Sequence, residues 1–182
     1  MVRDAMSALR LPIVGVMGSG VTADERAAEL GRELARLPVH LLTGGGRGAM
    51  EAVSRGFFEA KGRRGLVIGV LPADPDDPTR SRPGYPNPWI EIVIRTHLPL
   101  SGERGEHSLS RNHINVLTSD VLLALAGGAG TLSEVRLALR YGKPIAALVT
   151  GREDLPGLPQ EVTTLTTAGE AVAFAARQLG LA

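Results

Sequence analysis

Apolar residues along this chain fall into short runs that are nearly continuous rather than alternating. Runs of this kind are typical of strands buried on both faces of a parallel sheet. The strands predicted in this way are Pro12–Val16, Val39–Thr43, Leu66–Leu71, Trp89–Ile94, Val121–Ala126 and Pro144–Val149, with a short one at Val162–Leu165.

Between these runs, apolar residues recur at intervals of three and four, which is the period of a helix with one buried face. The helices predicted are Ala23–Leu37, Arg47–Lys61, His107–Ser119, Thr131–Tyr141 and Gly169–Leu179. Alternation of strand and helix predicts an α/β fold, a doubly wound and mostly parallel Rossmann-like sheet with helices on both faces. No linker divides the 182 residues, so we expect a single domain over 1–182.

Two segments have more than one interpretation. The stripe of Leu109, His113, Val116 and Leu117 is predicted to face either the sheet or a partner subunit. The stretch Pro72–Pro88 holds six of the 12 prolines and interrupts the alternation, so we predict an irregular loop. Such a loop is either a lid over a site or a surface connection.

Three of the predicted strands run directly into glycine turns. Where a turn leads into a helix, free backbone N–H groups and the positive end of the helix dipole favour an anion such as phosphate. Ligands of doubly wound sheets bind at the carboxyl ends of the strands, so the three turns predict one pocket for a phosphorylated ligand. The candidate binding residues are Gly18, Ser19, Gly44, Gly45, Gly46, Met50, Gly127, Gly128, Gly130 and Thr131.

The glycine turns differ from two well-known nucleotide motifs. Gly-Lys-Ser/Thr occurs nowhere, which excludes a Walker A loop. The Gly44–Gly48 turn follows the second strand rather than the first, and no acidic residue ends a strand about 20 positions later. NAD is therefore not expected as a ligand.

Polar residues near the turns add candidate chemistry. Thr131 and Glu134 have the spacing of a helix capping box. The same spacing places the Glu134 carboxylate one turn from the phosphate site, where it would bind ribose hydroxyls or stabilise a cationic sugar. Arg111 and Asn112 lie within a predicted helix, either on a solvated face or as a fork that binds phosphate or carboxylate.

Composition excludes several classes of function. The 20 basic and 19 acidic residues are scattered, which argues against a nucleic-acid or membrane surface. The chain has no Cys, and His97 and His107 are isolated, so no metal site is expected. Neither a signal-peptide core nor an apolar run of about 18 residues occurs, and a cytoplasmic location is the expectation.

Three segments resemble the Lonely Guy and lysine-decarboxylase-like superfamily, which also contains the molybdenum cofactor carrier proteins. Thr43–Met50 is similar to its T-G-G-G-x-x-G-x-M turn, Val67–Pro72 to its v-I-G-v-x-P strand, and Gly127–Glu134 to its G-G-x-G-T-x-x-E signature. The resemblance covers about 12–149. It implies a homo-oligomer, a dimer or larger, because relatives pair through helices beside the pocket.

The resemblance implies two competing functions. Cytokinin-activating phosphoribohydrolases cleave the N-glycosidic bond of nucleoside 5′-monophosphates, giving base and ribose 5-phosphate. They use an Arg and a Glu, which Arg111 and Glu134 match. Asn112 stands where they carry Lys, and Ala126 where they carry Pro, which is closer to the carrier-like branch.

For the carrier-like branch the implied ligand is the molybdenum cofactor or a nucleoside monophosphate, and no further cofactor is required. A nucleotide-sensing subunit is a third possibility that the residues leave open. Lysine decarboxylation is not expected, because neither Lys61 nor Lys143 lies where a pyridoxal Schiff base would form.

Overall fold

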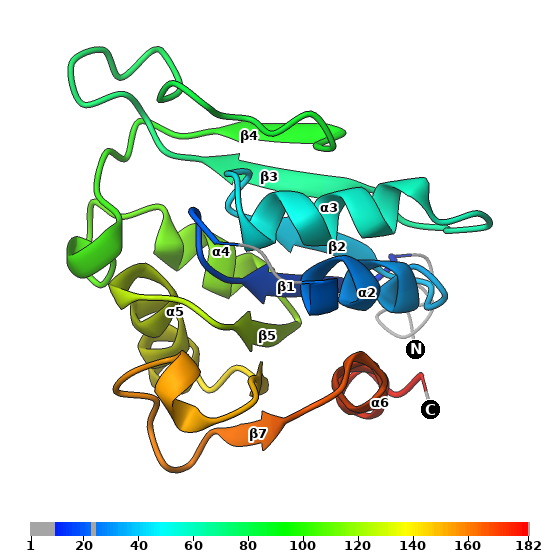
Figure 1. The fold of residues 1–182 in the computed structure, drawn as a ribbon. Coiled ribbons are helices and arrows are strands. Elements are labelled where there is room, and N and C mark those ends of the chain that lie inside the picture. Colours follow the sequence, from blue (N-terminus) through cyan, green and yellow to red (C-terminus); the bar gives the residue numbers. More distant parts are fainter. Residues whose placement is uncertain (1–9, 23–24, 182) are drawn as a thin grey trace, which may run out of the picture.

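The computed structural model describes residues 10–22 and 25–181, within which seven strands form one fully parallel sheet (Figure 1). The strands are β1 Ile13–Met17, β2 His40–Thr43, β3 Val67–Leu71, β4 Ile92–Arg95, β5 Val121–Leu125, β6 Ile145–Leu148 and β7 Thr163–Leu165. The helices are α2 Glu25–Leu34, α3 Ala49–Glu59, α4 Asn112–Thr118, α5 Ala129–Arg140 and α6 Ala168–Gln178, with short 3₁₀ helices at Gly102–Arg104 and Arg152–Asp154. The predicted α/β, doubly wound fold class is confirmed.

The sheet is covered on both faces because its strands are apolar on both sides. On one face, Val14, Val16 and the side chains aligned with them pack against α2, α3 and α6. On the other face, Met17, Leu42 and their neighbours pack against Val116 of α4 and Val135 of α5. Successive strand residues therefore feed two separate cores, which explains the continuous apolar runs in the sequence.

The order of the strands is β4-β3-β2-β1-β5-β6-β7. From β1 the chain first winds toward one edge of the sheet and then returns to continue from β5 toward the other edge. The connections after β1 and β5 therefore leave the sheet in opposite directions, and a crevice opens between the carboxyl ends of these two strands.

Helices α2 and α3 pack directly against each other (Figure 1). A Cβ on Gly31 would collide with the carbonyl oxygen of Val53, and one on Gly56 with that of Ala28. Glycine is therefore required at both positions for the two backbones to touch.

The predicted helices differ from the observed ones at their ends, most of all before α4. The predicted helix His107–Ser119 is wrong in its first turn and a half, because α4 starts only at Asn112. Residues 105–110 form turns instead, in which the Leu109 N–H donates to His107 Nδ1. Leu109 is consequently 48% exposed rather than part of a helical stripe. The predicted helix Ala23–Leu37 is α2 from Glu25 onward, and residues 23 and 24 lie outside those described.

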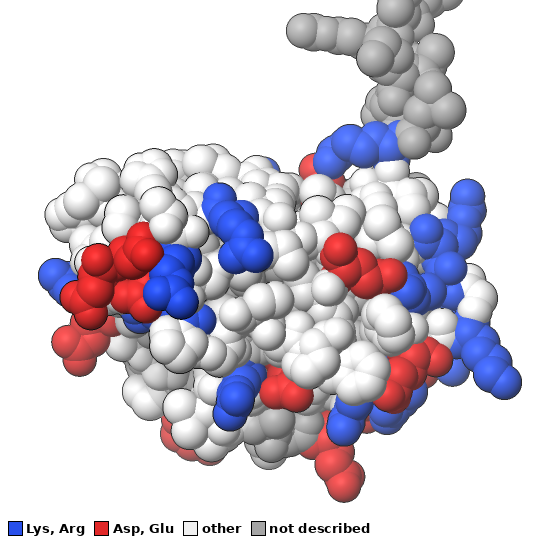
Figure 2. Space-filling model, turned by 90° about the horizontal axis from the view of Figure 1, so that it is seen from above, with Lys and Arg blue, Asp and Glu red and all other residues white. Residues whose placement is uncertain are grey.

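Charged side chains of both signs are interspersed on the face seen in Figure 2, with no field of one sign gathered there. That view agrees with the scattered charges of the sequence. Within the described residues, no helix combines the length and the apolar run that crossing a bilayer requires.

Candidate functional site

The three glycine turns meet at the carboxyl ends of β1, β2 and β5, as the sequence predicts. The turn after β1 lies between the other two. The Ser19 N–H donates to the Ala126 oxygen over 3.1 Å, and the Ser19 oxygen accepts from the Ala49 N–H over 2.9 Å. Gly48 has a φ of 62°, and a Cβ there would lie 2.5 Å from the Ser19 oxygen, so this close approach requires glycine.

A cleft of about 330 Å³ opens where the turns meet. Nine of the candidate residues line it: Gly18, Ser19, Met50, Arg111, Asn112, Gly128, Gly130, Thr131 and Glu134. Five further residues line it. Gly20 belongs to the predicted glycine turn after β1, whereas Val21, Tyr85, Ser101 and Gly102 carry no sequence pattern that predicts them. Tyr85 belongs to the proline-rich loop, which therefore forms one wall of the cleft.

The remaining four candidates lie behind the lining, and their observed contacts are with protein. The Gly45 N–H donates to Thr43 Oγ1 over 3.0 Å. The oxygens of Gly45 and Gly46 accept from the backbone N–H and the Nδ2 of Asn87, both over 2.8 Å. Gly44 faces the guanidinium of Arg111, with which a Cβ would collide. The Gly127 N–H donates to the Asp154 oxygen.

The start of α5 faces the cleft with its backbone open. Gly128 occupies the N-cap position with a φ of −108° and has no side chain that could cap the helix. Residues Gly128, Gly130 and Thr131 line the cleft. The first N–H groups of a helix lack partners within the helix, and the dipole adds partial positive charge, so this end favours an anion.

Arg111 is not on a solvated helical face. It immediately precedes the first residue of α4 and is only 5% exposed. Its Nε and Nη1 are buried and have no hydrogen-bond partner among the described residues. A buried guanidinium with unpaired donors is costly unless an acceptor reaches it.

Glu134 does not cap a helix, so the capping-box interpretation is wrong. Because α5 begins at Ala129, Glu134 lies in the second turn of the helix and is 7% exposed. Its Oε1 accepts a hydrogen bond from Asn115 Nδ2 over 2.8 Å. Burial raises the pKa of Glu134 above its ordinary value of 4.5, while the Arg111 charge and the Asn115 hydrogen bond oppose the rise.

Arg111 and Glu134 therefore put a cation and a carboxyl group into the same cleft. Their charges act on each other, yet no ion pair within 4.0 Å joins them in the part of the chain that the structure describes. Asn112 lies beside Arg111, and its Nδ2 donates to Ser133 Oγ over 2.9 Å. The arrangement can hold an anion at α5 and place polar groups of its ligand near Glu134.

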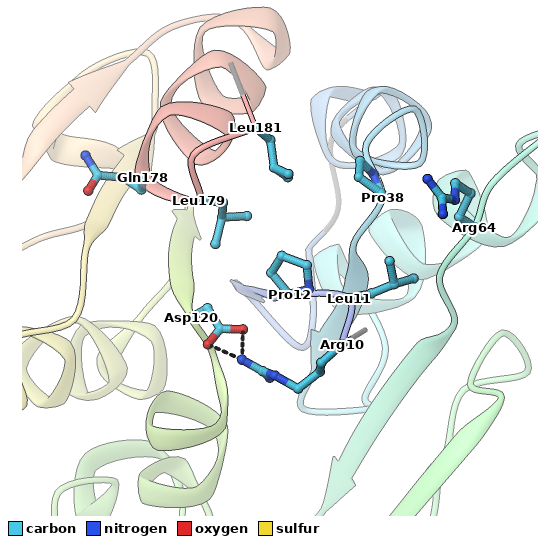
Figure 3. Close-up of a pocket in the computed structure, with 9 residues that line it drawn as sticks. All are labelled: Arg10, Leu11, Pro12, Pro38, Arg64, Asp120, Gln178, Leu179 and Leu181. Carbon is cyan, nitrogen blue, oxygen red and sulfur yellow. Dashed lines mark hydrogen bonds and ion pairs between the residues drawn. The ribbon is translucent and has the colours of Figure 1, made fainter. Parts of the chain in front are cut away.

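A larger cavity, about 510 Å³, lies at the amino ends of the strands (Figure 3). Arg10 points to Asp120 there, and the two are joined by hydrogen bonds of 2.8 and 3.0 Å. Asp120 also accepts from the Ile13 N–H. Arg10 and Asp120 are paired with each other, and no residue of a glycine turn lines this cavity, so size alone does not make it the candidate site. Among the described residues, no group of three His, Asp or Glu side chains is arranged to hold a metal.

The chain is similar to known proteins over most of its length. A family model described as the SLOG cluster4 family matches residues 11–175. An uncharacterized protein of Archaeoglobus fulgidus is 34% identical over 143 residues, which are 77% of this chain and 82% of that protein.

Two solved structures share 32% identity with this chain at a TM-score of 0.70, each covering 94% of this chain and 99% of the other. They are the molybdenum cofactor binding protein of Rippkaea orientalis and the molybdenum cofactor carrier protein of Chlamydomonas reinhardtii.

Proposed function

The chain belongs to the SLOG cluster4 family, and on that premise we propose that its cleft holds a phosphorylated ligand of the pterin or nucleotide type, as a carrier does. Two solved proteins similar to it are named for the molybdenum cofactor, a pterin-type ligand. The predicted resemblance to the Lonely Guy superfamily, and within it to the molybdenum cofactor carrier-like branch, agrees with these matches.

The guanidinium of Arg111 carries this proposal. It is buried, it lines the cleft, and its Nε and Nη1 donate to no described residue. Donors in this state gain about 1.5–3 kcal/mol each from a charged acceptor, and arginine matches phosphate with two parallel donors. A phosphate in the cleft would give this guanidinium an acceptor that the described protein residues do not supply.

The open start of α5 supplies the other half of the anion site. Its N–H groups and dipole face the same cleft as Arg111, so a phosphate between them is neutralised from two sides. Thr131 lines the cleft in the first turn of α5 and adds a hydroxyl donor.

Asn112 favours holding the ligand over cleaving it. The phosphoribohydrolase branch carries Lys at this position, and an amide adds no positive charge there. The Asn112 Nδ2 already donates to Ser133 Oγ. One cation, Arg111, is thus left where the hydrolases have two.

Mass spectrometry of small molecules released from the purified native protein tests the proposal. We expect a phosphorylated pterin or nucleotide at close to one per chain. Calorimetric titration with the identified compound, and with its dephosphorylated form, measures the contribution of the phosphate. Equal affinity for both forms would contradict an anion site at α5 and Arg111.

Glu134 favours a second candidate function, a nucleoside 5′-monophosphate phosphoribohydrolase. The carboxyl group is buried in the cleft, held by Asn115, and has no capping role. In such a reaction Arg111 would hold the ligand, and the ionised Glu134 would stabilise the oxocarbenium-like sugar as the base departs. Water would then take the place of the base, giving ribose 5-phosphate.

Release of free base from nucleoside 5′-monophosphates separates the two functions. A carrier releases none, whereas a hydrolase releases base in wild type and loses about 10²-fold or more of its turnover in Glu134→Gln. Binding of the monophosphate by Glu134→Gln should persist in either case, because Gln keeps the size and the hydrogen bond to Asn115.

A further inference from the structure

The cleft continues past Tyr85 into two further hollows, of about 370 and 440 Å³. Tyr85 lines all three spaces, and Arg47 and Gly84 line both outer ones. Glu51 lines the larger outer hollow. We call the space bounded by Arg47, Glu51, Gly84 and Tyr85 the outer subsite. None of these four residues was a candidate in the sequence.

The outer subsite holds charges of both signs that are not used by the protein. The side chains of Arg47 and Glu51 form no hydrogen bond or ion pair with any residue that the structure describes. Arg47 immediately precedes Gly48, the N-cap of α3, and Glu51 lies in the first turn of this helix. Because both line the larger outer hollow, this hollow has a hydrogen-bond donor at Arg47 and an acceptor at Glu51.

Tyr85 and Met50 form an apolar wall between the anion site and these charges. A Cβ built on Gly46 would lie 2.7 Å from Met50 Cε and 3.0 Å from Tyr85 Oη, so both side chains converge over Gly46. The wall is held in place from behind, because Asn87 of the same loop is bonded to Gly45 and Gly46. A flat heterocycle stacks favourably on such a surface.

We propose that the outer subsite reads the 2-amino-4-oxopyrimidine edge that guanine and pterins share. This edge presents, in order, a carbonyl acceptor, a ring N–H and an amino N–H. Arg47 would donate to the carbonyl oxygen, and the two oxygens of Glu51 would accept from the two N–H groups. On the same edge, adenine has an amino donor where guanine has the carbonyl oxygen, and a ring nitrogen acceptor where guanine has the ring N–H. Hypoxanthine has the carbonyl oxygen and the ring N–H but lacks the amino group. The inference rests on the proposed function, because the phosphate at α5 anchors the ligand.

Calorimetric titration of the full chain with GMP, IMP and AMP tests the subsite, with inorganic phosphate as the probe for the anion site alone. We expect GMP to bind about tenfold more tightly than IMP, and AMP to be weaker still. Titration with 6-hydroxymethylpterin monophosphate distinguishes the source: tighter binding than GMP identifies a pterin ligand, and weaker binding a guanine nucleotide.

Glu51→Gln isolates the acceptor side, because Gln has one acceptor oxygen in place of two. The preference for GMP over IMP should disappear, while affinities for AMP and inorganic phosphate stay within about twofold of wild type. Glu59→Gln, on an exposed residue at the far end of the same helix, is the matched control and should change none of these values.

Two results would overturn the inference, and they are distinguishable. If GMP, IMP and AMP bind equally and Glu51→Gln changes nothing, the outer subsite does not read this edge, and the proposed function survives. If inorganic phosphate, the nucleotides and the pterin monophosphate all fail to bind the folded protein, the anion site and the subsite fall together.

Discussion

Gly128→Val alters the candidate anion site while leaving the fold in place. The φ of Gly128 is −108°, which any residue adopts, and a Cβ built there meets no atom within 4 Å. We expect the free energy of unfolding to change by no more than about 1 kcal/mol, the cost of a poorer N-cap residue. The isopropyl group extends from a residue that lines the cleft, beside the first N–H groups of α5.

The expected loss of binding follows from the bonds that this side chain blocks. One hydrogen bond from the backbone to a charged phosphate contributes about 1.5–3 kcal/mol. Its loss raises the Kd by roughly 10- to 150-fold. Calorimetric titration with inorganic phosphate and with GMP measures the change, and thermal unfolding shows that the variant remains folded.

Gly45→Ala provides the contrast, because the same type of substitution there acts on the fold. Gly45 has a φ of 73°, and a Cβ would collide with Leu71 Cδ2. Left-handed backbone costs an alanine about 1–2 kcal/mol, and overpacking adds about 1–3 kcal/mol. We expect Tm to fall by roughly 4–20 °C.

If Gly128→Val stays folded and binds phosphate and GMP as wild type does, α5 is not the anion site.

Three further outcomes are expected. Glu134→Gln should flatten the pH dependence of stability. Burial raises the pKa of Glu134 above 4.5, so the folded wild type holds this proton more tightly than the unfolded chain and loses stability as the pH rises past 4.5. Denaturant unfolding at pH 5 and pH 8 should show this loss in wild type and not in the variant. Asn87→Ala leaves the buried Gly46 oxygen without its donor and should cost about 1–3 kcal/mol by the same assay, with weaker GMP binding as Tyr85 shifts. Light scattering should give about twice 19.1 kDa for wild type and 19.1 kDa for Leu117→Glu, since Leu117 is 51% exposed on α4; a wild-type monomer would refute the predicted dimer.

The fold could be predicted because its signals are local. Each of the seven predicted strands occurs. Strands β1, β2, β3, β5 and β6 are buried along nearly their whole length, which requires apolar residues at consecutive positions. The boundary of β4 shows the limit: Trp89 was predicted as its first residue, but its ring packs on Phe58 at 5.6 Å, and the strand begins only at Ile92. That contact joins residues 31 positions apart, which no local period reveals.

The candidate site could be predicted only where backbone chemistry defines it. Glycine after a strand is visible in the sequence, and so is the meeting of such turns at one edge. Asn115 was not predicted, because its partner Glu134 lies 19 positions away and no motif joins them. Arg111 was placed on a helix, because the bonds that replace the helix before it, such as Leu109 N–H to His107 Nδ1, depend on side-chain geometry.

Support and lining of the cleft are provided by different residues, and this has a consequence for evolution. Gly44, Gly45 and Asn87 hold the turns and the loop together from behind, where substitution damages the fold. Tyr85 and Gly128 line the cleft instead, and a Cβ on Gly128 would meet no atom within 4 Å. Single substitutions at lining residues can therefore change which ligand is preferred while the protein stays folded. New ligand specificities can thus evolve one substitution at a time without a change of fold.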